Sequence, residues 1–325
     1  MADLLTVINL RTSFHRPDGI VNAVNGISYS LGYGETLGIV GESGSGKSVS
    51  VLSLLKLLRS NARVESGEAL LEGRDLLKLS KEEMRKVRGK EIAMIFQNPM
   101  TCLNPTYRIG RQMIEPLLWH KEADRTGASS IAVKLLQQAG IPEASSRFGD
   151  YPFQFSGGMR QRVMIAMALT CNPKLLIADE PTTALDVTVR SQILNLLQEM
   201  KAEYKMSVII ITHDFGIATN FCDKLIVMYA GRIVESAPTV SFVLKPQHPY
   251  SKGLLRSTLD IDLNGEKLKP IPGNPPSLIN LPSGCAFHPR CEHCTEKCRN
   301  EIPELKQIDD QHSVACHMLQ EITSV

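Results

Sequence analysis

Long apolar runs are missing from this sequence. A helix that spans a bilayer needs roughly 20 consecutive apolar residues, whereas the most apolar stretches here, such as residues 207–212, have the length of a strand. Residues 1–10 also lack the basic, apolar and small-residue segments that together make an export signal. We therefore expect a chain that does not cross a bilayer by itself and that stays in the cytoplasm.

A large excess of charge of one sign is missing as well. The 36 Lys and Arg residues are nearly matched by 34 Asp and Glu, which leaves a formal charge of +2. Charge alone is then too weak to hold polyanions, and we expect no nucleic acid as a partner. With 325 residues, of which 43% are hydrophobic and 22% charged, the chain has the composition of a globular protein with more than one domain.

Short β-branched segments alternate with helical patterns over most of the chain, which predicts an α/β fold with a largely parallel sheet. The predicted strands are residues 37–40, 91–96, 175–178, 207–212 and 224–228. Residues 98–169 are mostly helical in pattern and predict a helical insertion between two halves of this core. Ser80 and Glu83 fit a capping box at the start of a short helix.

A glycine-rich segment with the sequence GESGSGKS joins the first predicted strand to a helical pattern, and it matches G-x-x-x-x-G-K-[ST]. Its glycines let backbone N–H groups turn toward a phosphate, and the following helix N-terminus adds positive potential. Lys47 would place its charge on the outer phosphates, and Ser48 its hydroxyl on Mg²⁺. An ordinary glycine-rich turn is the alternative. The residues expected around the phosphates are Gly41, Ser43, Gly44, Ser45, Gly46, Lys47 and Ser48.

Two carboxylates follow the apolar strand at residues 175–178. The carboxyl ends of parallel strands are where such sheets bind ligands. Asp179 is expected to hold Mg²⁺, and Glu180 to orient and polarise the water that attacks the γ-phosphate. The alternative interpretation is a solvated acidic turn after a core strand. The phosphate loop upstream disfavours this alternative.

Further short motifs distinguish between the classes of phosphate-loop proteins. Residues 155–162, FSGGMRQR, look like the signature motif of ATP-binding cassette proteins and lie upstream of the acidic strand. Gln97 resembles the Q-loop of that family, residues 184–186 (ALD) its D-loop, and His213 its switch histidine. Each motif alone is weak, so the order and spacing of the set, over residues 1 to about 240, carry the resemblance.

The resemblance implies a P-loop NTPase cassette in residues 1–245, with a RecA-like core, an antiparallel β subdomain and a helical subdomain at about 98–169. It implies catalytic roles for Glu180, His213 and Gln97, and Mg²⁺ ligation by Ser48, Gln97 and Asp179. Phe14 resembles the aromatic residue that stacks on adenine, although packing inside the antiparallel subdomain is an alternative. The other implied ATP contacts are Ser156, Gly157, Gly158 and Asp186.

Ser156, Gly157 and Gly158 precede a helical pattern, so they form a second helix N-terminus with free backbone donors. In the family this surface binds the ATP held by the partner subunit, which implies two cassettes that face each other head to tail. Met159 stands where many members have Gln, which affects only side-chain contacts. The implied partners are a second cassette ATPase, identical or related, and two transmembrane permeases at whose cytoplasmic face the chain would sit.

The last eighty residues differ in character. Residues 246–282 are rich in proline and are interpreted as a linker with a few docked turns. Residues 283–325 are too few to form a sizeable hydrophobic core, so we expect them to need a further stabilising element, such as a bound metal, in order to fold. Stretches such as HPY at 248–250 and GCAFHPRC at 284–291 resemble the tail of the ATP-binding subunits of dipeptide and oligopeptide importers, to which nickel importers are closely related.

This second resemblance implies an ATPase that drives peptide import, with an extracytoplasmic peptide-binding protein acting through the permeases. A nickel or other small-solute importer is the nearest alternative. A soluble cassette enzyme of DNA repair or translation is disfavoured because the chain has neither a long coiled coil nor a second cassette. A phosphotransferase is disfavoured by the signature motif.

Five of the eight cysteines lie between residues 285 and 316. Four thiolates in so small a region suggest a metal centre, either a [4Fe-4S] cluster or Zn²⁺. The cluster is favoured, because only Cys291 and Cys294 have the close paired spacing that zinc sites tend to use. Nearby histidines at 288, 293, 312 and 317 keep a mixed zinc site open, and unligated thiols are a third interpretation. The family pattern implies the ligands Cys285, Cys291, Cys298 and Cys316, with Cys294 left over. Away from this region, Cys102, Cys171 and Cys222 are interpreted as small core residues.

Overall fold

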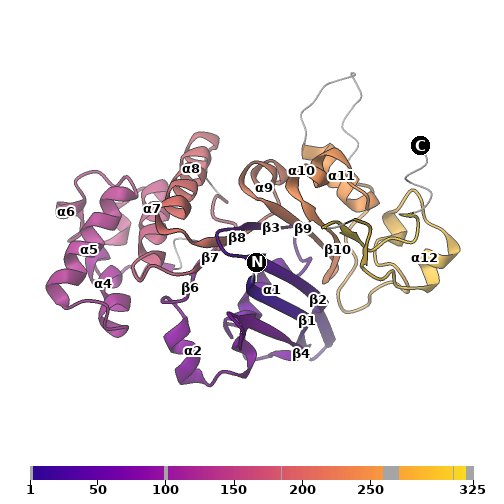
Figure 1. The fold of residues 1–325 in the computed structure, drawn as a ribbon, viewed down its shortest axis with the longest axis horizontal. Coiled ribbons are helices and arrows are strands. Elements are labelled where there is room, and N and C mark those ends of the chain that lie inside the picture. Colours follow the sequence, from indigo (N-terminus) through magenta and orange to yellow (C-terminus); the bar gives the residue numbers. More distant parts are fainter. Residues whose placement is uncertain (1–2, 99–101, 184, 259–270, 310, 320–325) are drawn as a thin grey trace. The chain divides into compact units, whose positions relative to one another are not determined.

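The computed structural model describes residues 3–98, 102–183, 185–258, 271–309 and 311–319 (Figure 1). The chain forms two compact units. The first contains Met1–Lys78 and Ile211–Val325, and the second contains Leu79–Ile210. The middle of the chain therefore forms one unit and its two ends form the other, and the middle unit includes strands as well as helices.

An antiparallel sheet occupies the N-terminal part of the first unit, in indigo and purple in Figure 1. Its strands pair in the order β2-β1-β4-β5. Along β1, Leu4, Leu5, Val7 and Leu10 are almost fully buried, which gives this sheet an apolar face. The strands are β1 (Asp3–Arg16), β2 (Gly19–Gly32), β4 (Ala62–Leu71) and β5 (Arg74–Asp75).

The first unit also contains the strand that leads into the phosphate loop. β3 (Thr36–Val40) pairs in parallel with β9 (Lys224–Tyr229), and all five β3 residues are buried. This is typical of a parallel strand that is covered on both faces. β10 (Arg232–Pro238) runs antiparallel to β9. The helices of this part are α1 (Lys47–Leu54), α9 (Phe215–Phe221) and α10 (Thr239–Leu244).

The second unit combines strands with the helical insertion. β6 (Ile92–Ile95) pairs in parallel with β7 (Leu175–Asp179), and β8 (Ser207–Thr212) reaches the boundary between the units. The helices are α2 (Lys81–Val87), α4 (Ile109–Trp119), α5 (Arg125–Gln138), α6 (Ala144–Arg147), α7 (Gly157–Ala168) and α8 (Val187–Tyr204). The capping box of α2 is confirmed, because Ser80 and Glu83 exchange side-chain to backbone hydrogen bonds.

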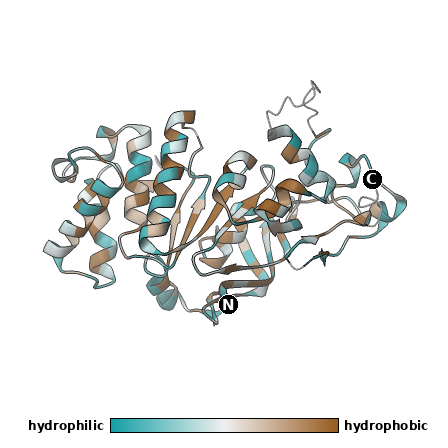
Figure 2. Ribbon diagram, turned by 45° about the horizontal axis from the view of Figure 1, so that its top comes forward, coloured by the Kyte–Doolittle hydropathy of each residue, from teal (hydrophilic) through white to brown (hydrophobic). Residues whose placement is uncertain are grey.

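The apolar periodicity predicted both strands and helices well. Figure 2 shows apolar residues concentrated along the strands, while the helices carry both apolar and polar residues. In α8 the residues at helical spacing, Ile193, Leu196, Leu197 and Met200, are all buried. Cys222 is buried as expected and Cys171 is half-buried. The prediction is wrong for Cys102, which is exposed. No helix in the described ranges is long and apolar enough to span a membrane.

The proline-rich segment contains more structure than expected. Within residues 246–282, which were interpreted as a linker with docked turns, the chain forms α11 (Pro249–Thr258). Proline fits the first turn of a helix because no intrahelical partner is needed for its missing N–H. Tyr250 is fully buried, so this segment is part of the core of the first unit. Residues 259–270 lie outside the described residues.

The C-terminal region extends the sheet of the first unit. β12 (Ser313–Val314) pairs with β10, and β11 (Lys306–Gln307) pairs with β12. Two short helical turns precede these strands, η3 (His288–Arg290) and α12 (Glu296–Asn300). A separate cysteine-rich module is therefore not supported, because the region belongs to the same compact unit as the phosphate-loop strand.

Candidate nucleotide-binding site

The phosphate loop connects the buried strand β3 to α1, as the sequence predicts. Three of its glycines have positive φ: Gly41 at 148°, Gly44 at 79° and Gly46 at 100°. A Cβ at Gly41 would lie 2.3 Å from the Met228 carbonyl oxygen, and one at Gly46 would lie 2.2 Å from that of Ala23. Only glycine satisfies both the backbone conformation and this close approach.

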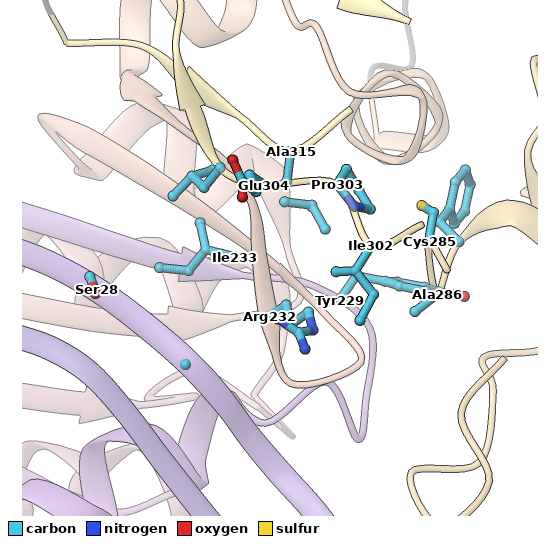
Figure 3. A pocket seen from close by; sticks show the side chains of 14 residues that line it. Ser28, Tyr229, Arg232, Ile233, Cys285, Ala286, Ile302, Pro303, Glu304 and Ala315 are labelled. Carbon is cyan, nitrogen blue, oxygen red and sulfur yellow. The ribbon is translucent and has the colours of Figure 1, made fainter. Parts of the chain in front are cut away.

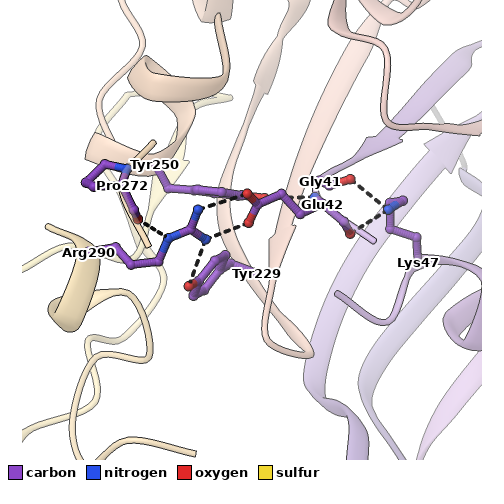
Figure 4. A network of polar contacts seen from close by, with 7 residues as sticks. All are labelled: Gly41, Glu42, Lys47, Tyr229, Tyr250, Pro272 and Arg290. Atoms are coloured by element: carbon purple, nitrogen blue, oxygen red, sulfur yellow. Dashed lines mark hydrogen bonds and ion pairs between the residues drawn. The ribbon is translucent and has the colours of Figure 1, made fainter. Parts of the chain in front are cut away.

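The polar groups of the loop point into its own turn. Lys47 is 5% exposed, and its Nζ donates hydrogen bonds to the carbonyl oxygens of Gly41 (2.7 Å) and Glu42 (2.9 Å) (Figure 4). The Ser45 hydroxyl is buried and has no hydrogen-bond partner among the described residues. Ser48 is half-buried in the first turn of α1. The loop thus gathers an ammonium group, a buried hydroxyl and a helix N-terminus, which are donors suited to phosphate oxygens.

The second unit brings Gln97 and Glu180 into direct contact. Gln97 Nε2 donates a 2.7 Å hydrogen bond to Glu180 Oε2, and Thr183 Oγ1 donates one of 2.9 Å to the same oxygen. Glu180 has φ 47°, a left-handed conformation that non-glycine residues adopt at a cost. Asp179, the last residue of β7, is 7% exposed. Sequence reasoning missed Thr183, because a threonine three residues downstream carries no motif of its own.

The signature segment starts α7 in the way the sequence predicts. The Ser156 hydroxyl caps the helix by accepting a hydrogen bond from the Met159 N–H at 3.3 Å. A Cβ at Gly157 would meet no described atom within 4 Å, whereas one at Gly158 would lie 2.9 Å from Val189 Cγ1. The backbone at Gly157 is therefore accessible at a helix N-terminus, the position where an anion binds most readily.

The remaining predicted residues take up varied environments. Asp186 caps α8 through a 2.8 Å hydrogen bond from the Val189 N–H to Oδ1, while Ala184 of the D-loop lies outside the described residues. His213 is exposed immediately after β8. Phe14 is half-buried in β1, opposite Val21 and Ala62 of the neighbouring strands. These positions leave the adenine-stacking role of Phe14 and the sensing role of His213 as predictions.

An ion pair that sequence reasoning missed joins the phosphate loop to the C-terminal region. Arg290 holds both carboxylate oxygens of Glu42, at 2.7 Å and 3.0 Å (Figure 4). This hydrogen bonding raises the pKa of Arg290 above its usual value. No pattern in the sequence could have indicated a contact between residues 248 positions apart.

The four predicted cysteine ligands lie near one another. Burial raises the pKa of Cys285 and of Cys291 to about 11 and also raises the pKa of Cys316, with the neighbouring thiols, Cys298 among them, adding to each shift. However, no group of three or more His, Cys, Asp and Glu side chains in the described residues is arranged to hold a metal ion. The thiols are neighbours without a preformed metal site.

A mixed cysteine and histidine zinc site is not supported either, because three of the candidate histidines contact other groups. His312 Nε2 lies 2.8 Å from Glu235 Oε1 in a buried pair. His288 Nδ1 lies 3.0 Å from the Cys285 carbonyl oxygen, and His317 Nε2 lies 3.0 Å from that of Glu301.

A hollow of about 550 Å³ lies between β10 and the C-terminal region (Figure 3). Its lining is mostly apolar, with Arg232 and Glu304 as charged members and Cys285 at its wall. None of the predicted nucleotide contacts lines it. This hollow is therefore not the nucleotide site.

The fold and the phosphate loop define a P-loop NTPase of the cassette type, and comparisons with known proteins agree. A family model described as ABC transporter matches residues 24–183, and one described as oligopeptide/dipeptide transporter, C-terminal region, matches residues 234–298. The dimeric structure of the bacterial ABC transporter cassette MJ0796 superposes with a TM-score of 0.65 at 28% identity, covering 72% of this chain and 98% of that one.

Sequence similarity to transport ATP-binding proteins extends over nearly the whole chain. The oligopeptide transport ATP-binding protein OppD of Escherichia coli is 51% identical over 96% of this chain and 92% of its own length. The dipeptide transport ATP-binding protein DppD of Bacillus subtilis is 48% identical over 97% and 95%, respectively. The chain belongs to the ATP-binding proteins of the ABC transporter family, which are ATPases.

Proposed function

We propose that this protein hydrolyses ATP to drive the import of dipeptides or oligopeptides through membrane permeases. The observation that carries the proposal is the combination, in one chain, of a complete phosphate loop with a C-terminal region matching that of oligopeptide and dipeptide transporters. The partners would be a second cassette ATPase, two permeases and an extracytoplasmic peptide-binding protein. The chain would work at the cytoplasmic face of the membrane.

The phosphates of ATP would lie in the loop between β3 and α1. The buried Ser45 hydroxyl, which lacks a partner among the described residues, and the Lys47 ammonium group are suited to phosphate oxygens. Ser48, Gln97 and Asp179 would hold Mg²⁺, since hydroxyl, amide and carboxylate oxygens are ligands this ion accepts. Phe14, which is half-buried in β1, would stack on the adenine through the face of its ring.

We assign to Glu180 the role of orienting and polarising the water that attacks the γ-phosphate. Its carboxylate oxygen Oε2 already accepts hydrogen bonds from Gln97 and Thr183, which fix the orientation of the carboxylate. A base fixed in this way is ready to orient and polarise water without first reorganising. His213 would contact the γ-phosphate and report its presence.

Two cassettes would enclose two ATP molecules, each nucleotide held by the phosphate loop of one chain and the signature segment of the other. The open space at Gly157 supports this arrangement, because it leaves the N-terminus of α7 accessible to a phosphate from outside the chain. ATP would favour the closed pair only if it binds that state more tightly than the open one. Hydrolysis would then reopen the pair and reset the permeases.

The cysteines of the C-terminal region would form a [4Fe-4S] centre on Cys285, Cys291, Cys298 and Cys316, with Zn²⁺ as the alternative. Their proximity supports the proposal, and the lack of a preformed site in the described residues weighs against it. Iron, zinc and acid-labile sulfide measured on anaerobically purified protein test it. Matching iron and sulfide that are lost in Cys298→Ser but kept in Cys294→Ser would support a cluster. Protein without metal or sulfide would exclude both centres.

Purification of the chain from membranes tests the transport function. We expect permease subunits to copurify, and the ATPase rate of the complex to rise when the peptide-binding protein is loaded with an oligopeptide. Stimulation by nickel and not by peptides would identify a metal importer. A chain that hydrolyses ATP but associates with no permease would point to a soluble cassette enzyme instead.

A further inference from the structure

Glu42 is the second residue of the phosphate loop, and its carboxylate forms a two-point ion pair with a residue far along the chain. Arg290 Nη1 and Nη2 reach the two carboxylate oxygens at 2.7 Å and 3.0 Å. The Arg290 side chain is 5% exposed and that of Glu42 is 27% exposed. A two-point, charge-assisted contact that is largely removed from water is both stronger and more directional than a surface ion pair.

The backbone of Glu42 is held as well. Its N–H donates a 2.8 Å hydrogen bond to the Tyr250 hydroxyl, and its carbonyl oxygen accepts one of 2.9 Å from Lys47 Nζ (Figure 4). Thus the same residue contacts Arg290 through its side chain and Tyr250 of α11 through its N–H, and contacts Lys47 of the phosphate loop through its carbonyl group. A displacement of Glu42 would therefore move the carbonyl oxygen that accepts the hydrogen bond from Lys47 Nζ.

Both residues that hold Glu42 are themselves fixed. Arg290 Nε donates to the Pro272 carbonyl oxygen at 2.8 Å, and Nη1 donates to the Tyr229 hydroxyl at 3.3 Å. Tyr250 is fully buried, with its ring centroid 4.6 Å from that of Tyr229 and 5.4 Å from that of Phe287. Arg290 and Tyr250 therefore form a fixed clamp on Glu42.

We propose that Arg290 is a positioning residue for ATP binding: by clamping Glu42, the C-terminal region sets the conformation of the phosphate loop and hence the affinity for nucleotide. This inference rests on the proposed function, in that the loop must bind ATP. It gives the C-terminal region a role in the nucleotide site itself, and this role is independent of whether the cysteines hold a metal.

The test is a titration of the full-length chain with Mg-ATP, well below its melting temperature, for wild type, Arg290→Gln, Glu42→Gln and the double variant. We expect each single variant to bind roughly tenfold more weakly, with the double variant no weaker than either, because the effects of two groups in direct contact are not additive. Arg299→Gln, an exposed arginine of the same region, is the matched control and should bind like wild type.

Two conservative variants separate positioning from folding. Arg290→Lys keeps the charge but cannot reproduce the planar fork, so it should recover only part of the affinity. Tyr250→Phe removes only the hydroxyl that accepts from the Glu42 N–H, and should weaken ATP binding without involving the ion pair. These two variants, together with the nearly isosteric Glu42→Gln, keep the inference testable if Arg290→Gln does not fold.

The outcomes are distinguishable. If Arg290→Gln, Glu42→Gln and Tyr250→Phe melt at lower temperature but bind ATP as wild type does, the clamp only anchors the tail and the inference is overturned. Additive losses in the double variant would also overturn it, because the two residues would then act separately. Wild-type protein that binds no ATP would contradict the proposed function instead.

Discussion

The side-chain amide of Gln97 donates a 2.7 Å hydrogen bond to the Glu180 carboxylate, joining two residues that are 83 positions apart in the chain. Gln97 follows β6 and Glu180 follows β7, and these parallel strands are paired. The contact places a predicted Mg²⁺ ligand against the predicted base. The same carboxylate oxygen also accepts from Thr183, so the orientation of Glu180 is set by two donors.

Replacing Glu180 by glutamine should abolish most turnover while leaving ATP binding intact. The amide oxygen still accepts hydrogen bonds from Gln97 and Thr183, so the local geometry is kept while the basic carboxylate is lost. A general base contributes about 10²- to 10⁴-fold, and we expect kcat to fall by that factor. Phosphate release and nucleotide titration measure the two effects, and size-exclusion chromatography with ATP should detect accumulated dimers.

Glu199→Gln is the matched control for that variant, because Glu199 is an exposed glutamate on α8, the next helix along the chain after Glu180. Its hydrolysis should equal that of wild type. Unchanged hydrolysis in Glu180→Gln would remove Glu180 from the role of base.

Replacing Gly157 by alanine should impair hydrolysis without harming the fold. A Cβ there meets no described atom of the chain within 4 Å, and alanine is the better helix former. If the backbone must approach ATP on a second cassette, the added methyl group displaces that contact, and a misplacement of about 1 Å can cost on the order of 10²-fold in rate. Steady-state ATPase assays and thermal melting give the two readouts.

Gly149→Ala is the control for Gly157→Ala, because its added Cβ would make only ordinary contacts, the nearest at 3.6 Å. It should keep the wild-type rate. Wild-type hydrolysis in Gly157→Ala would argue against a phosphate contact at the start of α7.

Acid should destabilise the protein through His248. Burial lowers the pKa of His248 to about 4, although the nearby Glu235 acts in the opposite direction. In the unfolded chain the pKa of His248 is near 6.5, so the unfolded chain takes up the proton before the folded chain does as the pH falls. The contribution of neutral His248 to the free energy of unfolding is therefore complete above about pH 6.5 and is lost progressively down to about pH 4. A shift of this size corresponds to roughly 3 kcal/mol of unfolding free energy.

His248→Asn isolates this contribution from the carboxylates that also titrate in this range. The Asn side-chain oxygen can take the place of Nδ1, which accepts a 3.0 Å hydrogen bond from the Tyr250 N–H. Urea unfolding at several pH values should give a flatter stability profile between pH 6.5 and 4 for this variant than for wild type. His293→Asn, at an exposed position, should leave the slope as it is in wild type. Equal slopes in His248→Asn and wild type would contradict the assignment.

Glu235 should be among the residues least tolerant of substitution. It is fully buried and accepts hydrogen bonds from the N–H groups of Gln247 and His248, besides pairing with His312 at 2.8 Å. Glu235→Leu would leave these groups unpaired, and removing one partner of a buried pair costs about 3–5 kcal/mol. Chemical denaturation measures this loss, with the exposed Glu292→Leu as control. If the loss of unfolding free energy is no larger than in the control, water must hydrogen-bond the groups that Glu235 pairs with in the wild type.

The local elements were predictable because their signals are local. The strand, loop and helix around Lys47 follow from one short motif, and the capping box at Ser80 follows from two residues three positions apart. The cap at Ser156 follows equally from its position before a helical pattern. At both caps the hydrogen bond joins residues three positions apart.

The long-range features were not predictable for the same reason. The proline content around α11 indicated a linker, but the fully buried Tyr250 gives this short helix a place in the core. The contact between Glu42 and Arg290 joins residues 248 positions apart, and the two-residue strand β12 has no periodicity to detect. A single sequence contains no information on such pairings beyond the resemblance to relatives.

Peptide accumulation in proteoliposomes tests the central claim most directly. The vesicles would contain the permeases and the full ATPase complex, with ATP supplied on the ATPase side, the loaded peptide-binding protein on the other, and a radiolabelled oligopeptide as the probe. We predict ATP-dependent accumulation with wild type and only background with Glu180→Gln. Equal accumulation with both proteins, or none with wild type under conditions in which it hydrolyses ATP, would contradict the account.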